Sequence, residues 1–342
     1  MSDEPMRVLV VKTSSLGDLI HTFPALSDAR CALPDIEFHW LVEEAFAEVP
    51  AWHPGVSTIL PIALRRWRGN WRKAWRKGEL SRFKQQLQQH SYDLVIDAQG
   101  LLKSALPARW ANGPVAGYDR HSVREPLASF FYAGKYPVSR QLHAVERIRR
   151  LFALALGYPE PREAPDFGLT GDDAAGSGGL VFLHSTTWAS KHWPLAYWVE
   201  LTQTAGQEGF DVAFPWYAPE ERLRAEKIMA RAGHGVLLPR MNLSGMKQCL
   251  QQAAGVVGVD TGLAHLAAAL NTPAITLYGP TAPGLTGAVG RRQKNLSVDW
   301  PCAPCMKRDC SYQEPAPVNP ACYQSLAPEI VWTALRQQMV NP

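Results

Sequence analysis

The sequence lacks the features of a membrane-spanning or secreted protein. None of its apolar runs reaches the roughly 20 residues that a bilayer crossing requires. The N-terminus, Met1-Ser-Asp-Glu-Pro-Met-Arg7, carries two acidic residues before a short apolar stretch, which is not the pattern of a secretory signal. We therefore expect a cytoplasmic protein that meets membranes, if at all, only at their surface.

Low-complexity runs, internal repeats and the common nucleotide-binding loops are also absent. No GxGxxG or Walker-type loop occurs, which disfavours a dinucleotide dehydrogenase or an ATPase. The 342 residues are 46% hydrophobic and 19% charged, which is typical of a globular protein with two domains of ordinary size. The formal net charge of +4 is too small to indicate a nucleic-acid partner by itself.

Short β-branched runs alternate with helical patterns in both halves of the chain. Arg7–Val11 predicts a strand, and a polar turn and a helical pattern follow it, which is the opening unit of a parallel α/β sheet. The alternation restarts at Leu180, after a stretch rich in Pro, Gly, Asp and Ala. The pattern predicts two Rossmann-like domains with parallel sheets facing a cleft. The expected parts are an N-terminal domain, a linker, a C-terminal domain and a C-terminal helix that could pack back on the first domain: 1–165, 166–179, 180–325 and 326–342.

One stretch carries the clearest sign of a binding site. Gly258-Val-Asp-Thr-Gly-Leu-Ala-His265 predicts a strand end, a tight turn flanked by glycines and the start of a small-residue helix. The free backbone N–H groups of such a helix point beyond the strand end, which is where phosphate groups bind. Asp260, Thr261 and His265 would share that site. The alternative is a packing element with a capping Asp260 and a buried His265.

Polar side chains follow other predicted strands as well. Ligands of open α/β sheets gather at the carboxyl ends of the strands, so these side chains are candidate site residues. Hydroxyl groups with an ammonium group suit a diphosphate, and a carboxylate suits ribose hydroxyls. For the two acidic candidates, Asp18 and Glu221, the alternative is a structural role in the first turn of a helix, where the helix dipole stabilises a negative charge. The candidates are Asp18 in the first half and Thr186, Thr187, Lys191 and Glu221 in the second.

A basic stretch over residues 65–77 carries seven cations, with Trp67, Trp71 and Trp75 at helical spacing. Within one helix over 65–89, the tryptophans would form a single stripe with the cations on its flanks. Nucleic acid, an anionic membrane surface or a phosphorylated, acidic acceptor would suit that surface. A solvated helix face with a core-facing tryptophan stripe is the alternative.

Four of the six cysteines lie in one short segment, at Cys302, Cys305, Cys310 and Cys322. Four thiolates at this spacing are compatible with a structural zinc or iron site of tetrahedral geometry. Four free thiols are the alternative. Nothing in the spacing ties this cysteine segment to catalysis.

Beyond these patterns, several motifs resemble the type I lipopolysaccharide heptosyltransferases of glycosyltransferase family 9. They occur in both halves and in the same order as in that family, from Met6 to about Gly290, whereas the cysteine segment departs from the better-known members. The motifs are Lys12-Thr-Ser-Ser-Leu-Gly-Asp-Leu-Ile-His21, Asp97-Ala-Gln-Gly-Leu-Leu-Lys103, Arg124-Glu-Pro-Leu-Ala-Ser129, Lys191-His-Trp-Pro194, Val259-Asp-Thr-Gly-Leu-Ala-His265 and Tyr278-Gly-Pro-Thr281.

The resemblance implies a GT-B fold, an inverting reaction and a place on the cytoplasmic face of the inner membrane. The expected reaction moves L-glycero-D-manno-heptose from ADP-heptose to the Kdo sugar of Kdo-lipid A, in lipopolysaccharide inner-core synthesis, without a cofactor for the chemistry and without nucleic acid. The near alternatives are the type II enzymes, which use a heptose acceptor, or another ADP-heptose-dependent heptosyltransferase. The remote alternative is a nucleotide- or nucleic-acid-binding module.

The resemblance also implies a role for individual residues. Asp18 matches the general base, Glu221 the ribose contact, and Met241 lies where the adenine is bound. An inverting displacement needs such a base and a stabilised diphosphate leaving group. The residues matched to the donor are Thr186, Thr187, Lys191, Glu221, Met241, Asp260, Thr261, Gly262 and His265. Those assigned to the acceptor are Arg65, Arg66, Arg68 and Arg124.

Overall fold

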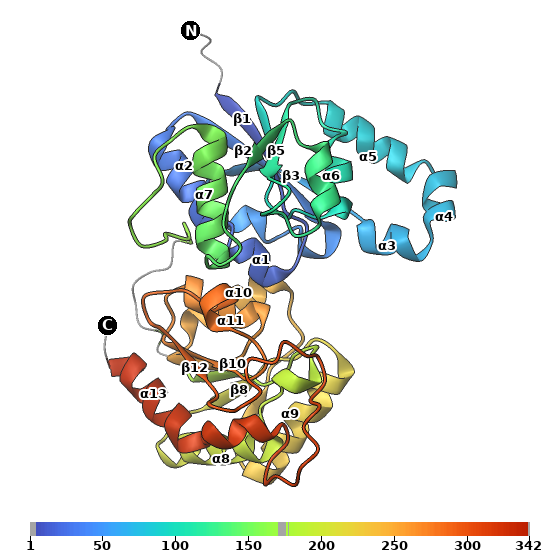
Figure 1. The fold of residues 1–342 in the computed structure, drawn as a ribbon. Helices are drawn as coiled ribbons and strands as arrows, with labels where there is room; N and C mark the ends of the chain where they lie inside the picture. The colour runs from blue at the N-terminus through green and yellow to red at the C-terminus, as the bar shows by residue number, and fades with distance from the viewer. Residues whose placement is uncertain (1–4, 170–175, 177, 341–342) are drawn as a thin grey trace. The chain divides into compact units, whose positions relative to one another are not determined.

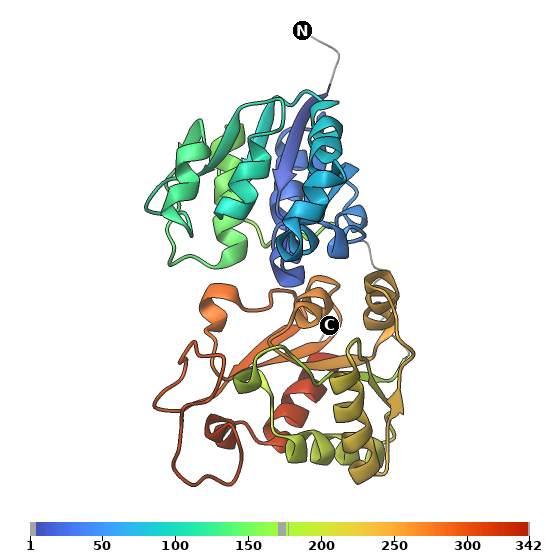
Figure 2. The ribbon, with the colours of Figure 1, turned by 90° about the vertical axis from the view of Figure 1, so that its right-hand side faces the viewer.

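The chain divides into two compact units, Met1–Leu169 and Thr170–Pro342. A computed structural model describes residues 5–169, 176 and 178–340 of them. Figures 1 and 2 show a central sheet with helices on either side in each unit. Half of the linker predicted over 166–179, residues 170–175 and 177, lies outside the described residues, and its boundaries stay predictions.

The first unit is built on six parallel strands in the order β3-β2-β1-β4-β5-β6. β1 lies between β2 and β4, so its apolar residues Val8 to Val11 are fully buried, as is typical of a central parallel strand. The strand order reverses between β1 and β4. The bounds are β1 (Met6–Val11), β2 (Ile36–Glu43), β3 (Val56–Ile62), β4 (Leu94–Asp97), β5 (Val115–Tyr118) and β6 (Gly134–Tyr136).

Helices α2 and α7 pack against each other in this unit. The guanidinium of Arg149 on α7 donates to both carboxylate oxygens of Asp28 on α2, at 2.6 and 3.0 Å, and thereby joins the two helices. The helices with seven or fewer residues are α1 (Leu16–Ile20), α3 (Leu64–Gly69), α4 (Trp71–Arg76) and α6 (Leu102–Ala108), and the longer ones are α2 (Phe23–Ala32), α5 (Glu79–Gln88) and α7 (Ala144–Leu156).

The single helix predicted over 65–89 is wrong, because the chain breaks into α3, α4 and α5 there. Asn70 leaves the helical conformation (φ −157°, ψ 62°), and Gly78 takes a left-handed one (φ 66°). The single tryptophan stripe is therefore also wrong. Trp67 is buried against Phe83, with ring centroids 5.8 Å apart, whereas Trp71 and Trp75 on α4 are 62% and 69% exposed.

The second unit repeats the architecture of the first. Its six parallel strands have the order β12-β11-β10-β7-β8-β9, which is the first unit's order when each unit is numbered from its own first strand. The strand order reverses between β7 and β10. These two sheets confirm the prediction of a GT-B fold with two Rossmann-like domains. The bounds are β7 (Leu180–Leu183), β8 (Val212–Phe214), β9 (Val236–Leu237), β10 (Gly255–Val259), β11 (Ala274–Tyr278) and β12 (Gln293–Ser297).

The core of the second unit is aromatic and includes Trp193, Trp198 and Phe182. The C-terminal helix α13 also belongs to this core, because its Val331 and Leu335 are fully buried there. The prediction that this helix packs back on the first domain is untested. The helices are α8 (Leu195–Gln207), α9 (Pro219–Ala232), α10 (Leu243–Gln252), α11 (Gly262–Ala269), α12 (Pro283–Thr286) and α13 (Pro328–Val340). Across the described parts of both units, no helix has the length and apolar character needed to cross a bilayer.

Candidate functional site

Polar turns lie at the point of strand-order reversal in both units. In the first unit, these turns follow β1 and β4, and in the second they follow β7 and β10. Doubly wound sheets bind their ligands in this place, beyond the carboxyl ends of the strands. Each unit therefore presents one candidate site, here called the first-unit site and the second-unit site.

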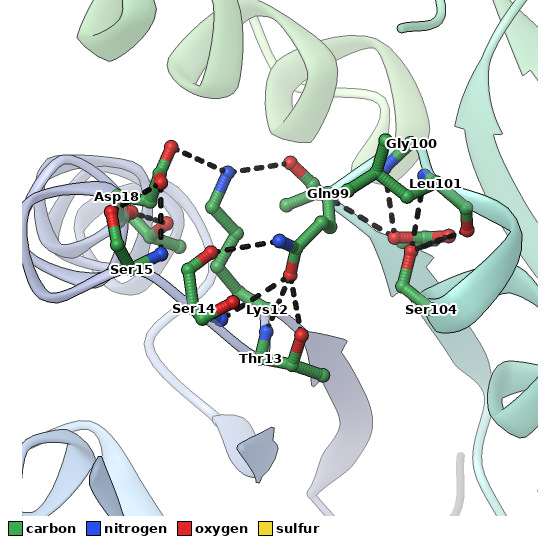
Figure 3. A network of polar contacts seen from close by, with 12 residues as sticks. Lys12, Thr13, Ser14, Ser15, Asp18, Gln99, Gly100, Leu101 and Ser104 are labelled. Atoms are coloured by element: carbon green, nitrogen blue, oxygen red, sulfur yellow. Dashed lines mark hydrogen bonds and ion pairs between the residues drawn. The ribbon is translucent and has the colours of Figure 1, made fainter. Parts of the chain in front are cut away.

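Asp18 lies in the first turn of α1, just beyond β1. Its Oδ2 accepts hydrogen bonds from the backbone N–H of Ser15 (2.9 Å) and from the Ser15 hydroxyl (2.8 Å). The Lys12 ammonium lies 3.6 Å from Oδ1, as Figure 3 shows, and 42% of the Asp18 side chain is exposed. The carboxylate is thus both held in place and open to a ligand.

The charge of Asp18 is set by its neighbours. Burial raises the pKa of Asp18, but the Lys12 charge and the Ser15 hydrogen bonds together outweigh burial and bring the pKa to about 2. Asp18 is therefore ionised throughout the physiological pH range. An ionised carboxylate accepts hydrogen bonds and protons but donates none.

Gln99 ties the turn after β4 to the turn after β1. Its Oε1 accepts from the Thr13 N–H (2.7 Å) and from the Thr13 hydroxyl (2.8 Å), while its Nε2 donates to the Ser14 carbonyl (2.7 Å). Figure 3 shows this side chain between the two turns. Thr13 and Ser14 lead directly into the turn that carries Asp18, so Gln99 fixes the backbone on which Asp18 is mounted.

The buried Asp97 holds the turn that carries Gln99. Its carboxylate accepts from the Tyr132 hydroxyl (2.7 Å), the Ser104 hydroxyl (2.9 Å), and the backbone N–H groups of Gln99 (2.9 Å) and Gly100 (3.2 Å). Burial raises the pKa of Asp97, although these hydrogen bonds act against it. Its position at the end of β4 makes Asp97 a support of the site.

Lys103 brings positive charge to the first-unit site. Its ammonium donates to the Ser14 hydroxyl at 3.3 Å. Burial lowers the pKa of Lys103, and the charges of Arg65 and Arg124 act in the same direction, whereas Glu43 and Asp18 act against them. These charges are close enough to influence one ammonium group. The charges of Arg65, Arg124 and Asp18 therefore all act on the Lys103 ammonium.

The other two arginines predicted for the acceptor have different surroundings. Arg66 forms ion pairs with Glu44, at 3.1 Å, and with Glu79, and so connects α3 to the segment after β2 and to α5. Trp67 also donates to Glu79, at 3.0 Å. Arg68 is exposed and has no ion pair in the part of the chain that the structure describes. Arg66 is thus occupied by acids of its own unit, whereas Arg68 is open.

In the second-unit site, Asp260 gathers side chains from three strand ends. The Lys191 ammonium lies 2.7 Å from its Oδ2, the Thr281 hydroxyl donates to the same oxygen at 2.7 Å, and His265 Nε2 lies 3.5 Å from Oδ1. Burial raises the pKa of Asp260, but hydrogen bonds and charges from His265 and Lys191 hold it well below its ordinary value. Lys191 is therefore fixed beside the turn that starts α11.

The turn after β10 has the predicted geometry. Thr261 caps α11, its hydroxyl accepting from the Ala264 N–H at 3.4 Å, and Gly262 begins the helix. A side chain at Gly258 would come within 3.1 Å of Leu183 on β7, so glycine allows the two strands to pack closely. The first N–H groups of such a helix lack partners within it and favour an anion.

The remaining predicted donor residues spread along the same sheet edge. Thr186 and Thr187 follow β7 on the loop that leads to Lys191. Glu221 lies in the first turn of α9, after β8, where its Oε2 accepts from the backbone N–H groups of Tyr217 and Ala218, at 2.7 and 3.2 Å. Met241 lies after β9, immediately before α10, and is partly buried. Neighbouring strands thus place these residues in a row from the point of strand reversal outward.

Sequence reasoning missed several residues of the two sites. Lys12, Gln99 and Lys103 stand in motifs that carried the resemblance, but they were given no role there. Gln99 had a usable signal, because it follows a buried strand at the same sheet edge as Asp18. The contact between Thr281 and Asp260 was not visible, because it joins turns that are 21 residues apart.

The predicted metal centre is not supported. All four cysteines of the segment are free thiols, with Cys302 and Cys310 exposed and Cys305 and Cys322 partly buried. Among the residues with described positions, no group of three or more His, Cys, Asp or Glu side chains could hold a metal ion. Burial raises the pKa of the Cys322 thiol to about 11, and the other three cysteines act in the same direction.

Comparison with known proteins gives consistent matches. A family model described as glycosyltransferase family 9 (heptosyltransferase) matches residues 80–315. Lipopolysaccharide heptosyltransferase 1 of Pseudomonas aeruginosa is 52% identical over 98% of this chain and 99% of its own. The protein of the same name from Escherichia coli K12 is 48% identical over 84% of this chain and 92% of its own.

Two solved structures of the E. coli heptosyltransferase WaaC are similar over most of the chain. The structure with ADP has a TM-score of 0.81 at 47% identity and covers 86% of this chain and 94% of its own. The structure with ADP-2-deoxy-2-fluoro heptose has a TM-score of 0.82 at 42% identity and covers 97% of this chain and 99% of its own.

Proposed function

The chain belongs to glycosyltransferase family 9 (heptosyltransferase), and on that premise we propose that it transfers L-glycero-D-manno-heptose from ADP-heptose to the Kdo sugar of Kdo-lipid A, as a step of lipopolysaccharide inner-core synthesis. The observation that carries the proposal is the pair of sites at the two points of strand reversal. One presents an ionised carboxylate, Asp18, and the other a lysine beside a helix N-terminus, Lys191. The near-full-length relatives named lipopolysaccharide heptosyltransferase 1 support the choice of acceptor.

The donor is assigned to the second-unit site. Lys191 and the first N–H groups of α11, at Thr261 and Gly262, would bind the diphosphate. Asp260 would hold Lys191 in place, and Asp260 and its partner His265 would face the heptose. The solved E. coli relatives that contain ADP and a fluorinated ADP-heptose support the choice of a nucleotide-sugar donor.

The nucleoside of the donor would lie along the strand ends beyond the diphosphate. Thr186 and Thr187 add hydroxyls to the phosphate region, next to Lys191. Glu221 uses one oxygen to cap α9, which leaves Oε1 for the ribose hydroxyls. Met241, two strands from β7, would contact the adenine.

The acceptor is assigned to the first-unit site. Arg65 and Arg124 lie near Lys103, beside Asp18, and Arg68 is open to solvent. Guanidinium groups bind carboxylates and phosphates through two hydrogen bonds, which suits the Kdo carboxylate and the phosphates of lipid A. Arg66 would contribute indirectly, since it fixes α3 through its own ion pairs.

The proposed chemistry is a single displacement with inversion. The acceptor hydroxyl attacks the anomeric carbon on the face opposite the diphosphate, the bond from that carbon to the diphosphate oxygen breaks, and Asp18 takes the hydroxyl proton. A hydroxyl becomes strongly acidic once its oxygen bonds to the anomeric carbon, so a base with a pKa of about 2 is adequate late in this step. Lys191 and α11 stabilise the charge that develops on the leaving ADP.

A place on the cytoplasmic face of the inner membrane follows from the acceptor, which is a lipid. The short helix α4 exposes Trp71 and Trp75 among the cations Arg72, Lys73 and Arg76. Exposed indole rings with flanking cations suit the interface of an anionic membrane. We assign α4 to peripheral contact with that surface.

The proposal is tested by incubating the full chain with ADP-heptose and purified Kdo-lipid A and analysing the lipid by mass spectrometry. The expected product carries one added heptose, and ADP is released in equal amount. An Asp18→Asn variant serves as the inactive control. If the wild-type protein releases no ADP and adds no sugar to the acceptor, the proposed function is wrong.

A further inference from the structure

The cysteine segment, residues 302–322, is bonded to the second-unit site. The buried Ser190, one residue before Lys191, donates its backbone N–H to the Arg308 carbonyl at 3.0 Å. Its hydroxyl donates to the Lys307 carbonyl at 2.6 Å. The spacing of the cysteines indicated no connection with catalysis, but the middle residues of this segment hold the loop that carries Lys191.

Two further contacts join the same region to the site. The Met306 N–H donates to the Pro280 carbonyl at 2.8 Å, in the turn that also carries Thr281. Tyr323, directly after the segment, donates its hydroxyl to the Lys191 carbonyl at 3.0 Å. The Lys191 loop and the turn after β11 are therefore both bonded to this part of the chain.

The Trp188 ring links the segment to Lys191 through charge. The Lys191 ammonium lies 4.7 Å from the ring centroid, and the Arg308 guanidinium lies 5.5 Å from the same centroid. Cations at these distances are attracted to an indole ring. Trp188 therefore places a second cation close to the one that the site already contains.

Arg308 differs from Lys191 in having no carboxylate partner among the described residues. Lys191 is already paired with Asp260 at 2.7 Å, whereas Arg308 is exposed and pairs with no carboxylate in the regions that the structure describes. Two cations and one carboxylate leave positive charge uncompensated around Trp188. An anionic ligand would compensate it.

We propose that Arg308 is a donor-binding residue whose guanidinium, stacked on Trp188 beside Lys191, binds the diphosphate of the nucleotide-sugar donor. This inference rests on the proposed function, which places the donor in the second-unit site. A planar guanidinium binds phosphate oxygens through two hydrogen bonds. Because the Arg308 side chain is already restricted by stacking on the indole ring, it loses less conformational freedom when the ligand binds. The same contact would strengthen as the diphosphate gains charge on departure.

The test is isothermal titration calorimetry of the full-length protein with ADP and with AMP. Arg308→Ala and Arg308→Gln are measured beside the wild type, and Arg291→Ala, which removes an exposed cation elsewhere in the same unit, is the matched control. We expect Kd for ADP to rise about tenfold in both Arg308 variants, the loss of one charge-assisted hydrogen bond. The rise should be smaller for AMP, which lacks the second phosphate, and smaller at high salt.

If both Arg308 variants bind ADP with the wild-type Kd, the inference is wrong. It is equally wrong if the Arg308 variants bind ADP normally while a third variant, Ser190→Ala, binds it more weakly. That second pattern would mean that the segment acts through its backbone contacts with Ser190 and not through the guanidinium. A wild-type protein that binds no ADP would instead contradict the proposed function itself. Circular dichroism and the thermal midpoint of each variant show whether the fold is kept.

Discussion

Asp18 is the residue that takes the acceptor proton in the proposed reaction. Replacing it by Asn keeps the shape of the side chain but removes its capacity to take a proton. We expect Asp18→Asn to lower kcat by at least ~100-fold, which is the range of general-base contributions. Because its contacts lie in the first unit, Kd for ADP should stay at the wild-type value. Asp35→Asn, an exposed acid of the same unit, is the control, and residual activity above about a tenth of wild type would exclude Asp18 as the base.

Lys12 is expected to determine the pH range in which Asp18 works. The Asp18 pKa of about 2 means that the wild-type rate should not fall with acid until far below pH 4. In Lys12→Met, the lowering effect of the Lys12 charge is lost while the Ser15 hydrogen bonds remain, so the pKa of Asp18 should rise from its wild-type value of about 2. The acid limb of kcat/KM should then lie at higher pH than in the wild type, as measured from the lowest pH at which both proteins stay folded up to ~pH 8. Superimposable pH profiles would show that Lys12 does not set this charge.

The same ion pair has a consequence for stability. The Asp18 pKa is lowered on folding, so the ionised form stabilises the folded state at pH values above the unfolded pKa of ~3.9. That contribution is lost as the pH falls through the folded value of about 2. The side chain is 42% exposed, so solvent screening reduces the size of the effect.

At the level of elements, the turns after β1 and β4 behave as one structure joined by Gln99. Gln99→Leu removes the hydrogen bonds to Thr13 and Ser14 but keeps a side chain of similar size. We expect kcat to fall ~10–100-fold, because a shift of about 1 Å in a catalytic group has an effect of this order. ADP affinity should not change. Gln85→Leu on the exposed face of α5 is the control, and an unchanged kcat in Gln99→Leu would show that the turn keeps its geometry without the amide.

The helices α3 to α5 divide their arginines between structure and binding. The double change Arg65→Gln and Arg68→Gln should raise the apparent KM for Kdo-lipid A at least tenfold, with the donor KM unchanged, because two charge-assisted contacts are lost. Arg66 is kept, since its ion pairs with Glu44 and Glu79 fix α3. Lys84→Gln with Lys135→Gln removes the same charge from other exposed positions. A rise in the donor KM alone would mean that these arginines bind the donor and not the acceptor.

Local sequence signals predicted the central strands well and the basic region poorly. β1, β4, β7 and β10 are continuous apolar runs, and such runs indicate buried strands directly from the sequence. The strands β5, β6 and β12 had little signal of their own, because β5 and β6 have only four and three residues and β12 is only partly buried. The break of the basic helix depends on the backbone conformations at Asn70 and Gly78, which a periodic pattern does not include.

At the level of the whole molecule, the strand order explains why the predicted residues lie where they do, which their order along the chain does not. Asp18 follows β1, and Asp260 follows β10, so both lie at a strand reversal that any Rossmann-like order would create. The partners that support them come from distant turns, as Gln99 and Thr281 do. Such contacts depend on tertiary packing, and this is why sequence reasoning found the residues of the strand-end turns but not those that hold them.

The central claim is that Kdo-lipid A, and not an acceptor already carrying heptose, receives the sugar. The most direct measurement is kcat/KM with ADP-heptose for Kdo-lipid A and for heptosylated Kdo-lipid A, offered separately and in competition, with the products identified by mass spectrometry. The account predicts one heptose added to the Kdo-terminated acceptor, with kcat/KM at least about tenfold higher than for the heptosylated one. Preferential transfer to the heptose-terminated acceptor would contradict it.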